Sequence, residues 1–200
     1  MLRDLLRRDL QDAIGFEVVG IATDDPRLPH CNAQRRGVWK YGFDDQFEPE
    51  LVPRLCTQHH LVPFTGSIKS DQFKELFLES WCPDLGIMNV FGQFLPFEIF
   101  SFPRFGFFNF HATSGEQWPA YQGPDPFSDM MRDGHRRCTL AFHRVVQEVD
   151  GGELYSFTDC AEIPQGASVP DLHMITAPLA SGLLRRILPK LLFPDPDIPG

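Results

Sequence analysis

The sequence has few cysteines, and none of them form a recognisable site. Five are scattered along 200 residues, the count is odd, and no two stand in a Cys-x-x-Cys arrangement. Structural zinc sites and disulfide frameworks need tighter spacing than this. We therefore expect no bound metal and a reducing, cytoplasmic environment. The cysteines are Cys31, Cys56, Cys82, Cys138 and Cys160.

Long hydrophobic runs are also missing. No apolar stretch reaches the roughly 20 residues that a membrane-spanning helix requires. The first residues mix charged side chains with leucines, which is unlike the apolar core of a secretory signal. These absences predict a soluble protein without a membrane partner.

Positive charge is scarce. The chain carries 18 Lys and Arg against 27 Asp and Glu, a formal net charge of −9. Nucleic-acid-binding proteins usually show a basic patch or stripe. The basic residues here form only short pairs, which are typical of solvated faces, so we expect no nucleic-acid partner. The pairs are Arg7–Arg8, Arg35–Arg36, Arg136–Arg137 and Arg185–Arg186.

Apolar residues, by contrast, are sufficient for a substantial core. They make up 42% of the chain, and 19 of them are Phe. The length predicts one folded domain, which we place at residues 1–192, followed by a Pro-rich tail at 193–200. No internal repeat is evident.

Helices and strands alternate in the first half of the chain. Leucines at helical spacing predict a helix over residues 2–14, ended by Gly15. Short strands are expected at 16–26 and 60–66, and helices at 49–58 and at 70–80, where Ser70 and Asp71 offer an N-terminal cap. Strands then follow more closely at 83–96, 105–111, 139–146 and 152–159, before a helical stretch at 171–192. The alternation predicts an α/β fold with a mostly parallel, twisted sheet and helices on both faces.

Asn109 and His111 stand at the end of an apolar strand. Side chains alternate along a strand, so these two point to one face, and Phe108 and Phe110 point to the other. In open α/β sheets, ligands bind at the carboxyl ends of the strands. Taken alone, the pair also fits an ordinary satisfied strand end.

Two further segments strengthen the functional interpretation. Residues 119–126, "PAYQGPDP", combine Pro and Gly into a loop of specified shape. Asp150 leads a turn made by Gly151 and Gly152, where its carboxylate is free to approach another strand end. On its own, Asp150 is equally consistent with a simple turn former.

Together, Asn, His and Asp suit acyl transfer to an amine. A His carries a proton near neutral pH, a carboxylate orients the imidazole, and an Asn amide donates to an oxygen that gains negative charge. No protein nucleophile is required if the amine attacks directly.

The chain resembles the folate-dependent formyltransferases, a family that includes methionyl-tRNA formyltransferase, glycinamide ribonucleotide transformylase and sugar N-formyltransferases. The family pattern is an apolar strand, N-x-H, a P-x-Y-x-G-x-x-P loop, a strand with a late His, and D-x-G. It is matched by Asn109 to His111, Pro119 to Pro126, Thr139 with His143, and Asp150 to Leu154. The resemblance extends from about Phe16 to Leu154.

The resemblance implies a Rossmann-like fold and formyl-tetrahydrofolate as formyl donor. Asn109 would bind the formyl oxygen, His111 would stabilise the oxyanion or move the proton, and Asp150 would hold His111. Two loops would line the pocket for the donor's pterin. Their residues are Phe91, Gly92, Gln93, Phe94 and Leu95 in one loop, and Val146, Gln147 and Glu148 in the other.

Three departures from the family pattern are visible. Three extra residues separate His111 from Pro119, which should reshape the acceptor side. Glu116 and Trp118 could then contact an amine, although Trp118 fits a surface lid or a packing residue equally well. Gln122 stands where many relatives carry Arg. The strand that normally precedes the first helix is absent from this sequence. An apolar slot would be left open in the sheet unless translation starts earlier, the sheet is rearranged, or another chain or segment fills the gap.

The acceptor is expected to be a small amine, with a nucleotide-linked amino sugar as the first candidate. The residues after Leu154 are too few for the additional domain of the tRNA enzyme, and the Gly turn used by the purine enzyme is absent. A homo-oligomer is compatible with the sequence. Alternatives are a folate- or nucleotide-binding member without turnover, a formyl-tetrahydrofolate hydrolase, and a metal-dependent hydrolase. The last would use His59, His60, His111, His143 and Asp150.

Overall fold

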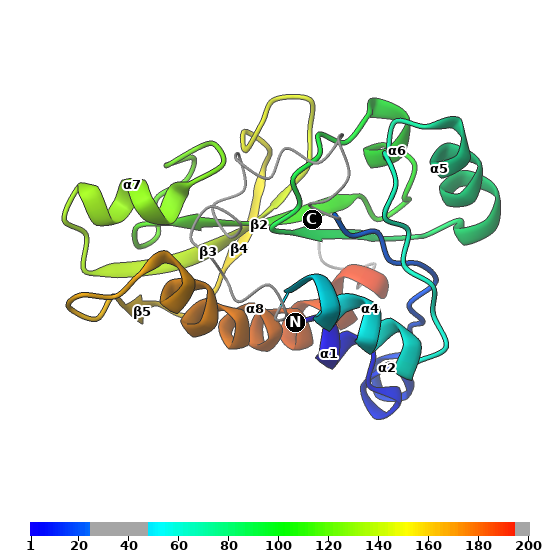
Figure 1. The fold of residues 1–200 in the computed structure, drawn as a ribbon, viewed down its shortest axis with the longest axis horizontal. Coiled ribbons are helices and arrows are strands. Elements are labelled where there is room, and N and C mark those ends of the chain that lie inside the picture. The colour runs from blue at the N-terminus through cyan, green and yellow to red at the C-terminus, as the bar shows by residue number, and fades with distance from the viewer. Residues whose placement is uncertain (25–47, 195–200) are drawn as a thin grey trace.

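A mixed β-sheet with helices on both faces forms the centre of the computed structural model (Figure 1). The structure describes residues 1–24 and 48–194. Two segments lie outside the described residues. They are residues 25–47, which include the end of the strand expected at 16–26, and the end of the expected tail from residue 195 on. The α/β, Rossmann-like fold class that the sequence predicts is confirmed.

The sheet has the order β1-β2-β3-β4, with β5 also paired to β3. Only β1 and β2 run parallel; β2–β3, β3–β4 and β3–β5 are antiparallel. Parallel pairing, expected for most of the sheet, is thus limited to its β1 side, because the chain after β2 returns through close antiparallel neighbours. The strands are β1 (Gly86–Asn89), β2 (Phe107–Thr113), β3 (Arg137–Arg144), β4 (Leu154–Phe157) and β5 (Ala161–Glu162).

One face of the sheet packs against α8 (Val169–Leu192) and α7 (Pro126–Arg132). Phe108 and Phe110 point into this core, as strand alternation predicts. The helix α8 begins at a capping box in which Ser168 and Asp171 bond each other's backbone N–H groups. This helix supports the strand that carries the polar pair.

The opposite face packs against α5 (Asp71–Glu75), the π-helical turn η2 (Leu76–Trp81) and α6 (Phe97–Phe100). Phe107 of β2 joins Phe73 and Phe77 in this second core. The predicted cap is confirmed, since the Ser70 hydroxyl accepts a hydrogen bond from the backbone N–H of Phe73 at 3.2 Å. Helices therefore cover both faces, as expected.

The N-terminal helix differs from its prediction. Instead of one helix over 2–14, there are two short ones, α1 (Leu2–Leu5) and α2 (Arg8–Ile14), because Arg7 has an extended backbone. The break lets Leu6 turn into the core, where it is 2% exposed. Gly15 ends α2 with a φ of 82°, in the left-handed region that favours glycine.

Two expected strands, at 16–26 and 60–66, do not form as regular strands within the described residues. They meet at one isolated parallel bridge, Ala22 with Phe64, while the helix predicted next to them forms as α4 (Glu48–Gln58). A regular strand needs a neighbouring strand that pairs with it over several residues. Among the described residues, β1 pairs in this way with β2 alone, so residues 16–24 have no such partner in the sheet. A cavity of about 440 Å³ is lined by residues 16–24 and by β1.

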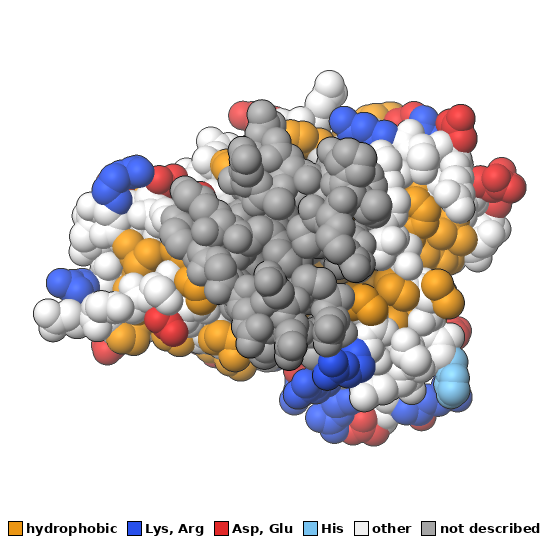
Figure 2. Space-filling model, viewed as in Figure 1, with side chains coloured by type: hydrophobic (Ala, Val, Ile, Leu, Met, Phe, Trp, Pro, Cys, Tyr) orange, Lys and Arg blue, Asp and Glu red, His pale blue; other side chains and the backbone are white. Residues whose placement is uncertain are grey.

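Charges of both signs lie close together around the N-terminal helices on the face drawn in Figure 2. Several arginines of the expected solvated pairs have acidic partners: Arg7 pairs with Asp9, and Arg185 lies 2.9 Å from Asp4. Such exposed pairs contribute little stability individually. In the described part of the chain, no helix has the length and apolar character needed to cross a membrane.

Candidate active site

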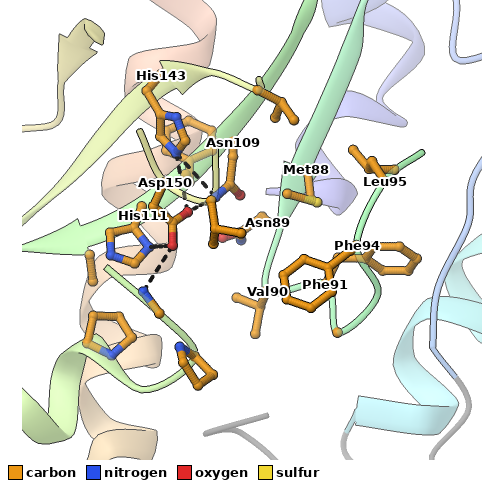
Figure 3. A pocket seen from close by; sticks show the side chains of 18 of the residues that line it. Met88, Asn89, Val90, Phe91, Phe94, Leu95, Asn109, His111, His143 and Asp150 are labelled. Carbon is orange, nitrogen blue, oxygen red and sulfur yellow. Dashed lines mark hydrogen bonds and ion pairs between the residues drawn. The ribbon is translucent and has the colours of Figure 1, made fainter. Parts of the chain in front are cut away.

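The candidate site is a cavity of about 1040 Å³ lined by the end of β1 and by residues within β2 and β3. Because β2 continues to Thr113, Asn109 and His111 lie within the strand and not at its end, where the sequence predicted them. All three expected catalytic residues and all eight expected pocket residues line it. Figure 3 shows the polar residues Asn109, His111 and Asp150 gathered together, with Phe91 and Phe94 further along the same cavity. Residues far apart in sequence are thus brought to one concave surface. The additional lining comes from residues 123–127 and from one side of α8.

Asn109 and His111 are held rigidly because β2 is a central strand, paired with β1 and β3. Their side chains are 7% and 6% exposed. Buried polar side chains are costly unless they are hydrogen-bonded, and both have partners within the site. Their location on one face, away from the core packing of Phe108, agrees with the prediction from strand alternation.

Asp150 is the residue that joins the other members of the site. Its Oδ1 accepts a hydrogen bond from Asn109 Nδ2 at 3.3 Å, and its Oδ2 lies 3.4 Å from His111 Nδ1. The backbone N–H of Gly123 also donates to Oδ2, at 3.1 Å. The carboxylate therefore contacts the strand β2 and the 119–126 loop at the same time.

His143 is a member of the site that the sequence-based assignment of catalytic residues left out. It lies on β3 directly opposite Asn109 and is 2% exposed. Its Nε2 is 3.3 Å from Asn109 Nδ2 and 3.7 Å from Asp150 Oδ1. The late His in the Thr139–His143 strand was the available signal, but its position depends on the β2–β3 register.

The hydrogen bonds assign the protonation of His143. Its Nδ1 lies 3.0 Å from the carbonyl oxygen of Arg144 and donates to it, so Nε2 is left to accept from Asn109. Burial lowers the pKa of His143 below its ordinary value of 6.5, against the opposing effects of the Arg144 carbonyl and Asp150. The neutral ring is thus the favoured form in the folded protein.

His111 is oriented from both sides. Its Nε2 donates to the carbonyl oxygen of Tyr121 at 2.7 Å, which fixes the ring against the 119–126 loop. Its Nδ1 faces Asp150. Because a backbone carbonyl is an acceptor only, a proton must remain on Nε2, and any proton exchange of this ring passes through Nδ1 and Asp150.

The backbone around Asp150 is specialised. Asp150 has a φ of 49°, which is uncommon for a residue other than Gly and costs on the order of 1 kcal/mol. A Cβ on Gly152 would stand 1.8 Å from the carbonyl oxygen of Arg144, so only glycine fits there. The shape of the turn therefore requires Gly152.

A buried network holds the loop that carries Phe91 and Phe94. Asp24 is 4% exposed and accepts hydrogen bonds from the backbone N–H of Gly92 at 2.6 Å and from Gln93 Nε2 at 3.0 Å. Gln93 Oε1 in turn accepts from the backbone N–H of Ile68 at 3.1 Å. The loop lies outside helices and strands, so hydrogen bonds to the Asp24 and Gln93 side chains take the place of regular backbone hydrogen bonds.

The inserted residues do not reach the acceptor side. Glu116 is exposed, and neither it nor Trp118 is among the residues that line the cavity, so the expected contact with an amine is not supported. Trp118 instead packs on His143, with ring centroids 4.3 Å apart. Gln122 donates to the carbonyl oxygens of Val149 and Asp150, at 3.1 and 3.0 Å.

The metal-hydrolase alternative finds little support in the geometry. His59 and His60 are exposed and follow α4, outside the cavity. Among residues 1–24 and 48–194, no group of three or more His, Cys, Asp or Glu side chains is placed to hold a metal ion.

Known proteins of similar sequence are formyltransferases. No protein-family model matches the chain. Methionyl-tRNA formyltransferase of Sulfurihydrogenibium sp. (strain YO3AOP1) is 25% identical over 178 residues, covering 88% of this chain and 51% of that protein. The enzyme of the same name from Thermotoga maritima is 30% identical over 144 residues, covering 70% of this chain and 40% of that protein. The chain thus spans about half the length of these curated relatives.

Solved structures of similar fold carry related names. Phosphoribosylglycinamide formyltransferase from Bacillus halodurans has a TM-score of 0.69 at 13% identity, covering 96% of this chain and 90% of that one. A formyltetrahydrofolate deformylase from Pseudomonas syringae pv. tomato has a TM-score of 0.63 at 17% identity, covering 94% of this chain and 57% of that one. At these identities, the likeness concerns the fold.

Proposed function

Because the chain belongs to the family of folate-dependent formyltransferases, we propose that it transfers a formyl group from formyl-tetrahydrofolate to the amine of a small metabolite. The observation that carries the proposal is the position of Asp150, whose carboxylate contacts Asn109, His111 and the Gly123 backbone at the wall of the cavity. This arrangement places a proton acceptor beside an amide donor.

The proposed roles follow from the contacts. Asn109 exchanges one of its long 3.3 Å hydrogen bonds for the formyl oxygen and stabilises the negative charge that develops there. Asp150 accepts the proton that the attacking amine loses, directly or through a water molecule. His111 takes this proton from Asp150 on Nδ1, and the proton then passes to the donor nitrogen as the carbon–nitrogen bond of the donor breaks.

The overall change is balanced without a protein nucleophile. A bond forms between the amine nitrogen and the formyl carbon, and the bond between that carbon and the donor nitrogen breaks. One proton moves from the amine to the donor nitrogen. His143 remains neutral and supports Asn109 from β3, so that the amide N–H groups stay directed into the site.

The cavity suits a folate donor. The formyl-tetrahydrofolate donor supplies an electrophilic carbonyl carbon attached to nitrogen. A flat, heteroatom-rich ring needs apolar faces and backbone hydrogen-bonding groups. Residues 91–95 and 145–150 lie outside regular helices and strands and offer both, with Phe91 and Phe94 among the lining side chains. We assign the donor to this part of the cavity.

The acceptor side is bounded by Asn89, by the 123–127 segment and by His173 and Thr176 of α8. The volume of about 1040 Å³ leaves room for a small acceptor beside the donor. A nucleotide-linked amino sugar is the first candidate. Methionyl-tRNA, which the names of the relatives specify, belongs in the same screen; the net charge of −9 disfavours it.

The first experiment is a calorimetric titration with a stable formyl-tetrahydrofolate analogue. We expect a dissociation constant on the order of micromolar, unchanged in His111→Ala and in the surface control His59→Ala. Formyl transfer to a panel of amines should fall by about 10²- to 10⁴-fold in His111→Ala and stay at the wild-type rate in His59→Ala.

Two outcomes would contradict this proposal. An absence of analogue binding would remove the donor assignment. Wild-type turnover in His111→Ala would remove the mechanism. Formate release at the full rate without any amine would instead support the hydrolase alternative, in which water takes the place of the acceptor. Analogue binding without any turnover would support the alternative of a binding protein without catalytic activity.

A further inference from the structure

The segment between β2 and the 119–126 loop is anchored by two buried threonines. Thr113 on β2 and Thr139 on β3 are paired across the strands and are 0% and 1% exposed. The Thr113 hydroxyl donates to the carbonyl oxygen of Gln117 at 2.7 Å, and the Thr139 hydroxyl donates to that of Gly115. The inserted residues therefore form a fixed support for the residue that follows.

That residue is Trp118, which contacts three parts of the site without lining the cavity. Its ring lies on His143, with a centroid distance of 4.3 Å and an interplanar angle of 32°. It meets His111 edge-on at 5.9 Å. Its indole N–H donates to the carbonyl oxygen of Gly152 at 2.9 Å. Trp118 thus packs against both histidines and bonds to the turn that carries Asp150.

The Asp150 turn is held from a second point by Gln122. The carbonyl oxygens of Val149 and Asp150 accept from the Gln122 amide, and that of Gly152 accepts from Trp118. Since Asp150 has a positive φ, the turn needs external contacts to keep this conformation. The insertion and the Gln, both departures from the family pattern, therefore act on the same turn.

We propose that Trp118 is a positioning residue for the proposed formyl transfer, which fixes the Asp150 turn through its N–H and excludes water from His143 with its ring. The inference rests on the proposed function for its catalytic consequence only. Its structural part, the shielding of His143, is independent of any reaction. The Trp118 side chain acts through Asp150 and His143 and does not touch the reactants.

The test uses two variants of Trp118 and a matched control. Trp118→Phe keeps an aromatic ring on His143 and removes the N–H; Trp118→Leu removes both. Trp81→Phe makes the same exchange in the second core, where Trp81 meets Phe73 and Phe77 edge-on. We expect kcat to fall about tenfold in Trp118→Phe and further in Trp118→Leu, with the analogue's dissociation constant unchanged and Trp81→Phe at the wild-type kcat.

A second readout does not depend on turnover. The titration of His143 is followed by NMR of its imidazole in wild type, Trp118→Phe and Trp118→Leu. Asp150 and His111 are the titratable groups that face His143, and both are retained in each variant. We expect the pKa of His143 to rise in Trp118→Leu, because water reaches the ring, and to change less in Trp118→Phe.

The outcomes separate the two proposals. If the wild type binds no analogue and transfers no formyl group, the proposed function fails, while the His143 titration still decides the shielding by Trp118. If the wild type is active, equal kcat in wild type and Trp118→Phe overturns the positioning role through the N–H. An unchanged His143 titration in Trp118→Leu overturns the shielding.

Discussion

The two walls of the cavity are held by different means. The polar wall, with Asn109, His111 and Asp150, is built on central strands and on a turn that receives hydrogen bonds from several neighbours. The aromatic wall, with Phe91 and Phe94, depends on the buried carboxylate of Asp24 and its hydrogen bonds to Gly92 and Gln93. Phe94 is 61% exposed. The residues of the proposed chemistry lie on central strands and on this turn, and those of the proposed donor contacts lie on a loop outside the helices and strands.

The comparison predicts that damage to the polar wall affects catalysis most. Asp150→Asn keeps the size of the side chain and removes its charge, so it should lower kcat by about 10²- to 10⁴-fold. The analogue's dissociation constant should stay close to that of the wild type. Steady-state kinetics and calorimetry measure the two effects.

Asp84→Asn is the matched control, because Asp84 is exposed, lies outside the residues that line the cavity, and forms an ion pair with Arg104 at 2.8 Å. It should leave both values unchanged. A large loss of analogue affinity in Asp150→Asn, with kcat preserved, would reverse the assignment of the two walls.

The next largest effect is expected on stability. Gly152→Ala would place a Cβ 1.8 Å from the Arg144 carbonyl oxygen, and the backbone must shift to accommodate it. The free energy of unfolding should fall by about 1–3 kcal/mol. Gly182→Ala in α8, where the nearest side-chain atom is 3.9 Å away, should be neutral or stabilising. Urea denaturation measures both, and equal stability of the two variants would contradict the tight turn.

Damage to the aromatic wall should affect binding. Asp24→Ala removes the carboxylate that accepts hydrogen bonds from Gly92 and Gln93, so the loop loses these two hydrogen bonds. We expect the analogue's dissociation constant to rise about tenfold, equivalent to about 1.4 kcal/mol, with kcat at saturating donor unchanged. Gln93→Ala and the double variant complete a cycle in which the two effects should be less than additive. Strict additivity would show that Asp24 does not act through Gln93.

The smallest effect concerns the pH dependence of stability. The pKa of His143 is lowered in the folded state by burial, so the unfolded chain binds more protons below pH 6.5. Stability should therefore decrease as the pH falls through about 6.5, and be complete above it. In His143→Gln this decrease should be shallower. Denaturation at a series of pH values from 7.5 to 5 checks it, and parallel curves for the two proteins would exclude His143 as a contributor.

Local patterns in the sequence predicted the local features of the structure. Alternation placed Asn109 and His111 on one face, and Gly15 and Ser70 marked helix ends that are observed. These features depend on residues within one turn or strand. The prediction that the chain is an α/β, Rossmann-like member of its family rested on the spacing of such motifs.

Features that depend on distant partners were missed. His143 reaches Asn109 through the β2–β3 register, and Asp24 reaches Gly92 across 68 residues; neither follows from a local pattern. The residues at 16–24, the described part of an expected strand, have strand-forming composition but meet a partner at a single bridge. Oligomeric state, cytoplasmic location and the acceptor stay predictions.

The antiparallel pairing of β2, β3 and β4 also has a consequence for folding kinetics. The paired residues of these strands are 11 to 36 positions apart, fewer than the 68 positions between Asp24 and Gly92, so the strand contacts should form earlier. The Asp24–Gly92 contact closes a much longer loop and should form late and open first. Native-state hydrogen exchange should then show the amide of Gly92 exchanging through local opening, while the amides of β2 and β3 exchange only through global unfolding. The strands β2, β3 and β4, which hold the proposed catalytic residues in place, would remain folded during such openings. Release of the proposed donor would then not require these strands to unfold.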